Sequence, residues 1–273
     1  MAPEAAVISD SLSVEAIRRK LSSETVGRQM YLFGVVSSTN AALHKLAKAG
    51  AREGTVVLAE AQSEGRGRSG QPWFSPPRVN LYASVLLRPP ISPKAVPVFS
   101  LIASLALTEA IWAEGLQAAI KWPNDVLVER KKVAGSLVEC ASAGDHVEYV
   151  ILGIGVNLNV RREALRNALG DAAHAATSLR EVAGHEIDRN GFAATFLALL
   201  DQWFRAYAAR GPEAVLAAWR DRDILTGRRV EIRGEGGDYE GRVLGVNREG
   251  RLVVEDIRGR LHQVISGEIR LFD

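Results

Sequence analysis

The pattern of apolar and polar positions predicts a chain in which short strands and helices alternate. Short runs rich in valine, isoleucine, leucine and aromatic residues, bounded by glycine, proline or asparagine, are typical of strands. The predicted strands cover residues 31–36, 55–61, 80–87, 118–122 and 147–156. Two further apolar runs, at 126–128 and 133–138, flank a charged turn and therefore predict a hairpin.

Apolar residues at helical spacing predict the helices that pack on these strands. The predicted helices cover residues 41–49, 97–115 and 192–207, with a shorter one around residues 14–21. Ser38, Thr39 and Asn40 can cap the first of them, and Gly50 can end it. Pro97 suits the start of the next helix, because an N–H there would have no partner within the helix.

After residue 226 the pattern changes to short strands separated by glycine-rich turns, which indicates a small all-β unit. We therefore expect a lead-in segment at 1–30, a catalytic domain at 31–225 and a C-terminal domain at 226–273. The lead-in is too short for a three-helix DNA-binding module, which needs roughly twice that length to bury a core. The expected fold class is α+β, with a mixed sheet backed by helices.

Composition narrows the class of protein. The 273 residues are 47% hydrophobic and 24% charged, which is enough apolar content for a core. No apolar run reaches the length of about eighteen residues that a membrane span needs. The formal net charge of +2 is too small for a surface that coats nucleic acid. Cys140 is the single cysteine, which excludes an internal disulfide and suits a cytoplasmic protein.

The segment from Gln62 to Trp73 reads Q-S-E-G-R-G-R-S-G-Q-P-W and carries the strongest chemical signal. Its glycines allow the backbone to bend close to a ligand, and Arg66 and Arg68 supply fixed charge with forked donors suited to oxyanions. The spacing matches neither a P-loop nor a dinucleotide-binding fingerprint. A solvated basic turn is the alternative, and the segment alone does not decide between the two.

Other candidate positions each have an ordinary structural interpretation. Ser38, Thr39 and Asn40 would most often be a plain helix cap, although their place at a strand end leaves a pocket role open. Lys121 and Lys132 are either surface lysines or cations that reach the same cleft as the arginines. The five histidines lack metal-ligand spacing, so no metal site is predicted.

Six motifs, taken in order, resemble those of biotin protein ligases. They are S-S-T-N at 37–40, E-A-Q-S-E-G-R-G-R-S-G-Q-P-W at 60–73, N-L-Y-A-S at 80–84, K-W-P-N-D at 121–125, K-V-A-G-S-L-V-E at 132–139 and G-I-G-V-N at 153–157. No single motif is diagnostic, but their joint order is specific. The resemblance covers residues 31–273 and implies a catalytic fold like that of class II aminoacyl-tRNA synthetases, followed by an SH3-like β-barrel.

The resemblance implies an enzyme that joins biotin to AMP and transfers it to a lysine of the biotin carboxyl carrier domain of an acyl-CoA carboxylase. The expected substrates and cofactors are therefore biotin, ATP and Mg²⁺. Carboxylate and triphosphate repel each other, so cationic groups should dominate the barrier. By resemblance, Arg66, Lys121 and Lys132 are catalytic, and the Gly/Arg segment closes over the intermediate.

The resemblance also assigns ligand contacts by position. The expected biotin contacts are Ser38, Thr39, Asn40, Gln62, Arg66, Gly67, Arg68, Trp73, Lys132, Gly153 and Gly155. The expected ATP and adenylate contacts are Arg66, Arg68, Lys121, Asn124, Asp125, Lys132 and Asn157. Gly153 and Gly155 are expected to let the ligand lie against the sheet. Mg²⁺ is expected to be held through phosphate oxygens and water, so no protein ligand is named for it.

Three departures limit the resemblance. Gln71 and Glu64 stand where the family often has an arginine and a small residue, which bears on the affinity for anions. Residues 161–176 contain no aromatic residue to cover adenine, so the adenine contact is left open.

Two other functions compete with this one. A lipoate or octanoate ligase or transferase shares the catalytic fold but lacks the combination of the G-R-G-R run with K-W-P-N-D. A nucleic-acid-binding module would use the basic segments and the C-terminal unit. Biotin-dependent release of pyrophosphate from ATP separates the three. We expect an enzyme with no DNA or membrane partner, and the sequence leaves open whether it forms a homodimer.

Overall fold

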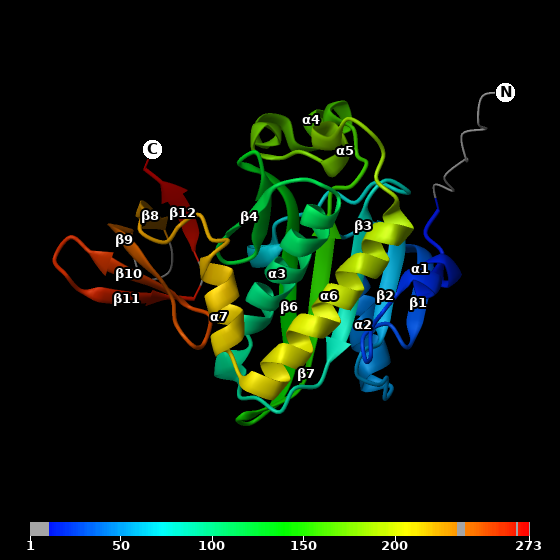
Figure 1. Cartoon of the computed structure of the whole chain (residues 1–273), viewed down its shortest axis with the longest axis horizontal. Coiled ribbons are helices and arrows are strands. Elements are labelled where there is room, and N and C mark those ends of the chain that lie inside the picture. The colour runs from blue at the N-terminus through cyan, green and yellow to red at the C-terminus, as the bar shows by residue number, and fades with distance from the viewer. Residues whose placement is uncertain (1–10, 234–237, 266, 273) are drawn as a thin grey trace.

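The computed structural model of the chain describes residues 11–233, 238–265 and 267–272. The first ten residues of the expected lead-in segment and the G-E-G-G run at 234–237 lie outside the described residues, as do residues 266 and 273. The described part forms a mixed sheet of seven strands with helices on both faces, and a separate sheet of five strands (Figure 1). The predicted α+β fold class is confirmed.

The seven-stranded sheet has the strand order β1-β2-β3-β7-β6-β5-β4. Its strands are β1 (Met30–Val36), β2 (Val56–Gln62), β3 (Leu81–Leu87), β4 (Ala118–Lys121), β5 (Asp125–Val128), β6 (Lys131–Ala143) and β7 (His146–Val156). Only β1 and β2 run parallel, because a helix connects them, and the other neighbours are antiparallel. The predicted strands are present, and β6 extends well beyond the predicted run.

Side chains of the central strands alternate between two cores. In β7, Val150 and Leu152 face the larger core, whereas Tyr149 and Ile151 face the smaller one. The smaller core is closed by α2 (Thr39–Lys48), and the larger by α3 (Val98–Ala113) with α6 (Arg189–Arg210) packed over it. The other helices are α1 (Val14–Lys20), α4 (Arg162–Leu169), α5 (Leu179–Ala183) and α7 (Glu213–Arg220), with 3₁₀ turns at Arg68–Gly70, Pro93–Ala95 and Gly170–Ala175.

The apolar character of α3 follows from its position. Residues Pro93–Ala113, with a mean hydropathy of 1.7, are long and apolar enough to cross a membrane by length and composition alone. However, 67% of the most apolar stretch is buried inside the protein, because α3 lies between the sheet and α6. The core helix of a soluble protein passes the same test, so α3 is weak evidence for a membrane span.

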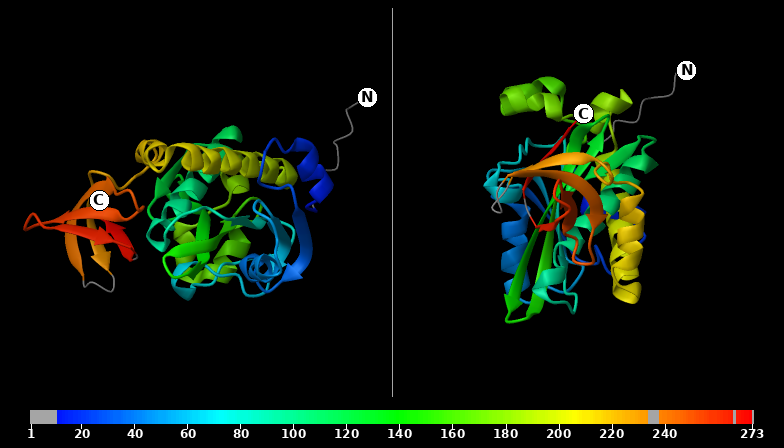
Figure 2. Two further views of the ribbon diagram at one scale, coloured as in Figure 1. Left: turned by 90° about the horizontal axis from the view of Figure 1, so that it is seen from below. Right: turned by 90° about the vertical axis from the view of Figure 1, so that its left-hand side faces the viewer.

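The C-terminal sheet is antiparallel, with the strand order β11-β10-β9-β8-β12. Its strands are β8 (Arg229–Arg233), β9 (Tyr239–Val246), β10 (Leu252–Asp256), β11 (Leu261–Val264) and β12 (Glu268–Leu271). It lies at the opposite end of the molecule from α1 (Figure 2). The indole nitrogen of Trp122 donates to the Gly250 carbonyl at 3.0 Å, which joins the K-W-P-N-D segment to the β9–β10 turn.

Candidate active site

Three neighbouring strands present small residues on the α2 face of the sheet, close to the N-terminus of α2. Gly153 of β7 pairs with Ser84 of β3 on one side and with Leu137 of β6 on the other, and Gly155 pairs with Gly135. Because the glycines carry no Cβ, this part of the sheet is a shallow floor. The floor forms the base of a cavity of about 950 Å³.

Two side chains occupy the space over these glycines. A Cβ atom on Gly153 would lie 2.3 Å from Oδ1 of Asn40, and one on Gly155 would lie 2.4 Å from Cε2 of Trp73. Both distances are too short for a side chain to be added without movement. Asn40 and Trp73 thus cover the two glycines in this structure, and the contact of a ligand with Gly153 and Gly155 stays a prediction.

The N-terminus of α2 opens into the same cavity. Ser38 occupies the N-cap position, yet its side chain makes no capping hydrogen bond. Ser38, Thr39 and Asn40 all line the cavity and are nearly buried. A plain helix cap would have used the serine hydroxyl on the helix N–H groups. The hydroxyl of Ser38 thus remains available to a bound molecule.

A chain of polar groups fixes this end of the cavity. The backbone N–H of Thr39 donates to Oε1 of Gln62 at 2.9 Å, and Nε2 of Gln62 donates to the hydroxyl of Ser75 at 3.1 Å. The Ser75 hydroxyl donates in turn to the Trp73 carbonyl at 3.0 Å. Gln62 therefore connects the start of α2 with the Gly/Arg segment, and the orientation of its amide is set by both neighbours.

The Gly/Arg segment folds as a small hairpin over the cavity. The N–H of Gly67 donates to the carbonyl of Gln71 at 2.7 Å, and the N–H of Trp73 donates to that of Gly65 at 2.8 Å. Arg68 extends from the tip of the hairpin, where its guanidinium lies 5.9 Å from the centre of the Trp122 ring. It also donates to the carbonyl of Ile265 in the C-terminal domain at 3.3 Å.

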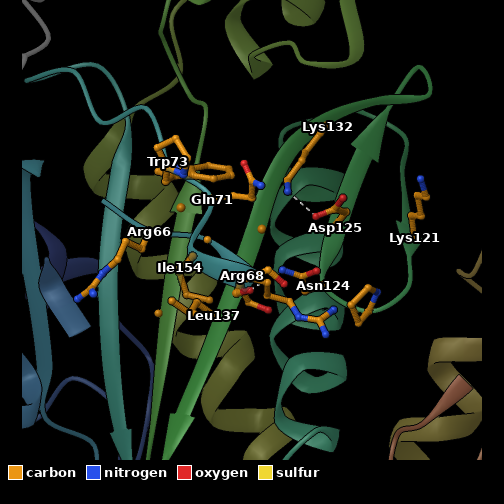
Figure 3. Close-up of a pocket in the computed structure, with 18 of the residues that line it drawn as sticks. Arg66, Arg68, Gln71, Trp73, Lys121, Asn124, Asp125, Lys132, Leu137 and Ile154 are labelled. Atoms are coloured by element: carbon orange, nitrogen blue, oxygen red, sulfur yellow. Dashed lines mark hydrogen bonds and ion pairs between the residues drawn. The ribbon is translucent and has the colours of Figure 1, made fainter. Parts of the chain in front are cut away.

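Two cations of the cavity, Lys132 and Arg68, are held by protein groups. Nζ of Lys132 lies 2.5 Å from Oδ1 of Asp125 and 5.3 Å from the centre of the Trp73 ring (Figure 3). Burial lowers the pKa of the Arg68 guanidinium from its ordinary value, and the Asp125 carboxylate opposes that shift. Arginine remains protonated at neutral pH even so. Each of these cations can exchange its present partner for an anion.

Arg66, Arg68, Lys121 and Lys132 all line the one cavity, although they do not meet at a point. Figure 3 shows Arg66 turned away from Lys132, and Lys121 on the far side of Asp125. Asn124 also lines the cavity, but its amide already donates to the Ser136 carbonyl at 2.6 Å. The four cations, which were expected to converge, therefore line the same cavity without forming a cluster.

Comparison with known proteins identifies this arrangement. Residues 32–157 match the Biotin/lipoate A/B protein ligase family, and residues 225–271 match the Biotin protein ligase C terminal domain. The chain is 35% identical to the bifunctional ligase/repressor BirA of Bacillus subtilis over 261 residues, covering 95% of this chain and 79% of the relative. The chain belongs to the biotin protein ligase family. The predicted resemblance is confirmed, and the separate C-terminal match weighs against the lipoate alternative.

Other members of the family match over almost their whole length. The biotin–acetyl-CoA-carboxylase ligase of Mycobacterium tuberculosis is 32% identical over 272 residues, which cover 95% of this chain and 97% of that protein. The biotin protein ligase of Aquifex aeolicus, solved in complex with biotin and ATP, superposes with a TM-score of 0.73 at 26% identity, over 90% of this chain and 99% of that one. As a member of this family, the chain is a biotin ligase enzyme with the family's catalytic fold and an SH3-like C-terminal domain.

Some site features were not anticipated from the sequence. Asn157 does not line the main cavity but a second hollow of about 200 Å³, which also contacts Trp73 and Lys132. Its remaining walls are Pro72, Phe74, Leu165, Leu169, Ala172, Ala175 and Ala176. The helical spacing of Leu165 and Leu169 was the available signal for α4, which sequence reasoning did not use.

The C-terminal domain also reaches the main cavity of this biotin ligase. Arg233, Glu268 and Arg270 are among its lining residues, and each lies far along the chain from the motifs. A pattern of short strands gives no sign of which of their side chains will face another domain. Among the described residues, no group of three or more histidine, cysteine, aspartate or glutamate side chains could hold a metal ion.

Proposed function

We propose that the chain activates biotin with ATP to form biotinyl-5'-AMP and then transfers the biotinyl group to a lysine of a biotin carboxyl carrier domain. The observation that carries the proposal is the composition of the cavity of about 950 Å³. One end offers uncharged hydrogen-bonding groups of Ser38, Thr39 and Gln62, and the other carries Arg68 and Lys132. A molecule with a polar, uncharged ring and a carboxylate that must meet a triphosphate fits both ends.

The reaction requires that two anions be brought together. A carboxylate oxygen of biotin attacks the α-phosphorus of ATP, the bond to the bridging oxygen breaks, and pyrophosphate leaves. In the second step the neutral amine of the acceptor lysine attacks the acyl carbon, AMP leaves, and the amine loses a proton. Lys132 is proposed to exchange Asp125 for the reacting oxygens, because fixed positive charge lowers the cost of the charge that develops there.

The remaining residue roles are proposed as the family resemblance implies them. We propose Arg66 and Lys121 as further catalytic cations, each after a side-chain movement toward the phosphates. The proposed biotin contacts are Ser38, Thr39, Asn40, Gln62, Arg66, Gly67, Arg68, Trp73 and Lys132, with Gly153 and Gly155 acting by making room for Asn40 and Trp73. The proposed adenylate contacts are Arg66, Arg68, Lys121, Asn124, Asp125, Lys132 and Asn157.

Adenine is proposed to occupy the second hollow. This hollow is lined by Asn157 and by aliphatic side chains of α4 and the following turn, and it shares the lining residues Trp73 and Lys132 with the main cavity. Leu165 and Ala172 would cover a purine ring by van der Waals contact, without the aromatic residue that residues 161–176 lack. An apolar wall beside one amide suits a flat base with a polar edge.

Magnesium and the protein partners are also part of the proposal. Mg²⁺ would arrive with the triphosphate and be held mainly by phosphate oxygens and water, since no three-residue ligand cluster is found among the described residues. The acceptor is proposed to be a carboxylase carrier domain, in line with the name of the mycobacterial relative. We further propose a cytoplasmic location, no DNA or membrane partner, and a division of the chain near residue 225.

One measurement tests the proposed function. Pyrophosphate release from ATP is expected to depend on added biotin and on Mg²⁺, and lipoate or octanoate should not replace biotin. A purified carrier domain should then become labelled on one lysine. Folded protein that releases no pyrophosphate with biotin, or that prefers lipoate, would contradict the proposal.

A further inference from the structure

The turn between β9 and β10 reaches from the C-terminal domain to the start of α3. Gly250 of this turn is buried there, and a Cβ atom placed on it would lie 3.0 Å from the backbone nitrogen of Val98 and 3.1 Å from the carbonyl carbon of Pro97. Its φ angle of +77° lies in the left-handed region that favours glycine. A side chain at this position would therefore strain the turn and press it away from α3.

The turn is shaped by its own hydrogen bonds. Oδ1 of Asn247 accepts from the backbone N–H of Glu249 at 3.1 Å and from that of Arg251 at 2.9 Å. The N–H of Gly250 donates to the Asn247 carbonyl at 2.9 Å. An asparagine side chain that satisfies nearby backbone groups in this way fixes a turn. The C-terminal domain therefore sets the direction in which the Gly250 carbonyl points.

This carbonyl holds the side chain of Trp122. Nε1 of Trp122 donates to it at 3.0 Å, and Trp122 is only 3% exposed. An indole has a single N–H, so this one bond uses its whole hydrogen-bonding capacity. A buried N–H that lost its acceptor would be left unsatisfied, which is costly. The position of the Trp122 ring in the cavity wall thus depends on the β9–β10 turn.

The Trp122 ring in turn supports Arg68 at the tip of the Gly/Arg hairpin. The Arg68 guanidinium lies 5.9 Å from the centre of the Trp122 ring, and it donates to the Ile265 carbonyl at 3.3 Å. Ile265 belongs to the C-terminal domain, and Trp122 is bonded to that domain through Gly250. Both contacts of the hairpin tip therefore depend on where the C-terminal domain sits.

We propose that Gly250 and Trp122 are positioning residues through which the C-terminal domain keeps the Gly/Arg hairpin over the bound adenylate. This inference rests on the proposed function, because biotinyl-5'-AMP is the molecule that is retained. Gly250 does not line the cavity and acts through Trp122 and Arg68. When the turn shifts, the indole loses its acceptor, the guanidinium loses its support, and the adenylate escapes faster.

The first test measures this escape in two variants of the full chain. Gly250→Ala places a side chain against the start of α3 and displaces the turn. Trp122→Phe keeps an aromatic ring but removes the N–H that bonds to the turn. Both variants should raise the labelling of an unrelated lysine-rich protein, relative to the carrier domain, by about three- to tenfold, because each loses modest contacts.

Arg248→Ala is a matched control in the same turn. Nη2 of Arg248 lies 2.6 Å from Oε1 of Glu213 in α7, and both side chains are exposed. This ion pair joins the same two domains without involving Trp122, and an exposed pair contributes little. The labelling ratio should stay within about 1.5-fold of the wild-type value. A rise as large as that in Gly250→Ala would show that any loosening between the domains releases the adenylate, and it would overturn the inference.

Combination with Arg68→Ala separates positioning from a general structural role. If Gly250 acts through Arg68, adding Gly250→Ala to Arg68→Ala should change the labelling ratio by less than about 1.5-fold, because the affected contact is already absent. A general structural defect would instead multiply the effect of Arg68→Ala by its own. Multiplied effects in the double variant would therefore contradict the inference.

These outcomes are distinct from those that test the proposed function. Biotin-dependent pyrophosphate release together with an unchanged labelling ratio in Gly250→Ala and Trp122→Phe would overturn this inference and leave the proposed function standing. If Gly250→Ala fails to fold, Trp122→Phe carries the test alone, both as a single variant and combined with Arg68→Ala. Absence of any biotin-dependent release in the wild-type protein would overturn the proposed function, and this inference with it.

Discussion

At one end of the cavity, Thr39 is hydrogen-bonded to Gln62 and to the buried Ser84, and no side-chain movement is needed to present Thr39 and Gln62. At the other end, Lys132 is paired with Asp125, and Arg68 rests on Trp122 and on a carbonyl of the C-terminal domain. The first end is preorganised for an uncharged ring. The second holds its cations on groups that an incoming phosphate can replace.

This difference follows from what each end must bind. An uncharged ring offers weak interactions, so affinity depends on donors and acceptors that are already oriented. Free cations without a partner would be costly beside a partly buried cavity, so acidic, aromatic and carbonyl groups hold them until the anion arrives. We call the end with Thr39 and Gln62 the ring end and the end with Lys132 and Arg68 the phosphate end. Changes at the ring end should therefore appear in KM for biotin. Changes at the phosphate end should appear in kcat or in the retention of the intermediate.

The largest effect is expected from Lys132→Ala. Loss of the ammonium should lower kcat for pyrophosphate release by roughly 10²–10³, with little change in KM for biotin, because the charge acts mainly on the transition state. Lys131→Ala, which removes a neighbouring charge outside the cavity lining, is the control and should stay within about twofold. Stopped-flow or coupled detection of pyrophosphate measures both. Unchanged turnover would show that the phosphate end does not depend on Lys132.

The two ends were not equally predictable from the sequence. Thr39, Gln62, Arg68 and Lys132 lie in motifs, and each does line the one cavity. The strand pattern also gave the central sheet, because alternation along a half-buried strand is a local property. A local pattern cannot predict contacts between distant segments, such as the hydrogen bond from the Arg68 guanidinium to the Ile265 carbonyl.

Two site features show the same limit in other ways. Asn157 follows a strand as expected, yet it faces a separate hollow, because the path of α4 after the strand decides what covers it. Glu139 ends a recognised motif, but its contact with Asn40 arises only when β6 and the start of α2 come together. Neither outcome is encoded in the spacing of residues along the chain.

A smaller effect is expected from Ser38→Ala, which probes the ring end. Ser38 makes no capping bond in α2, so its removal should leave the free energy of unfolding nearly unchanged while KM for biotin rises by about three- to tenfold. Ser13→Ala is the matched opposite case, because the Ser13 hydroxyl does accept from the N–H of Ala16 at 3.2 Å. It should lose about 1 kcal/mol of stability without a change in KM. Chemical denaturation and steady-state kinetics on both variants separate the two roles, and a loss of stability in Ser38→Ala would make that serine a simple cap.

An effect of similar size is expected from Arg68→Ala, and it concerns retention rather than rate. The side chain holds the tip of the Gly/Arg hairpin through a 3.3 Å hydrogen bond to Ile265 and a ring contact with Trp122, both of them modest interactions. Losing them should let biotinyl-5'-AMP escape on the order of three- to tenfold faster, with kcat for its formation reduced less than in Lys132→Ala. The measurement is the labelling of an unrelated lysine-rich protein relative to the carrier domain. Arg52→Ala, which removes an exposed charge outside the cavity, should show no such increase. Equal labelling ratios in both variants would mean that the hairpin does not retain the intermediate and that the phosphate end is held closed by other contacts.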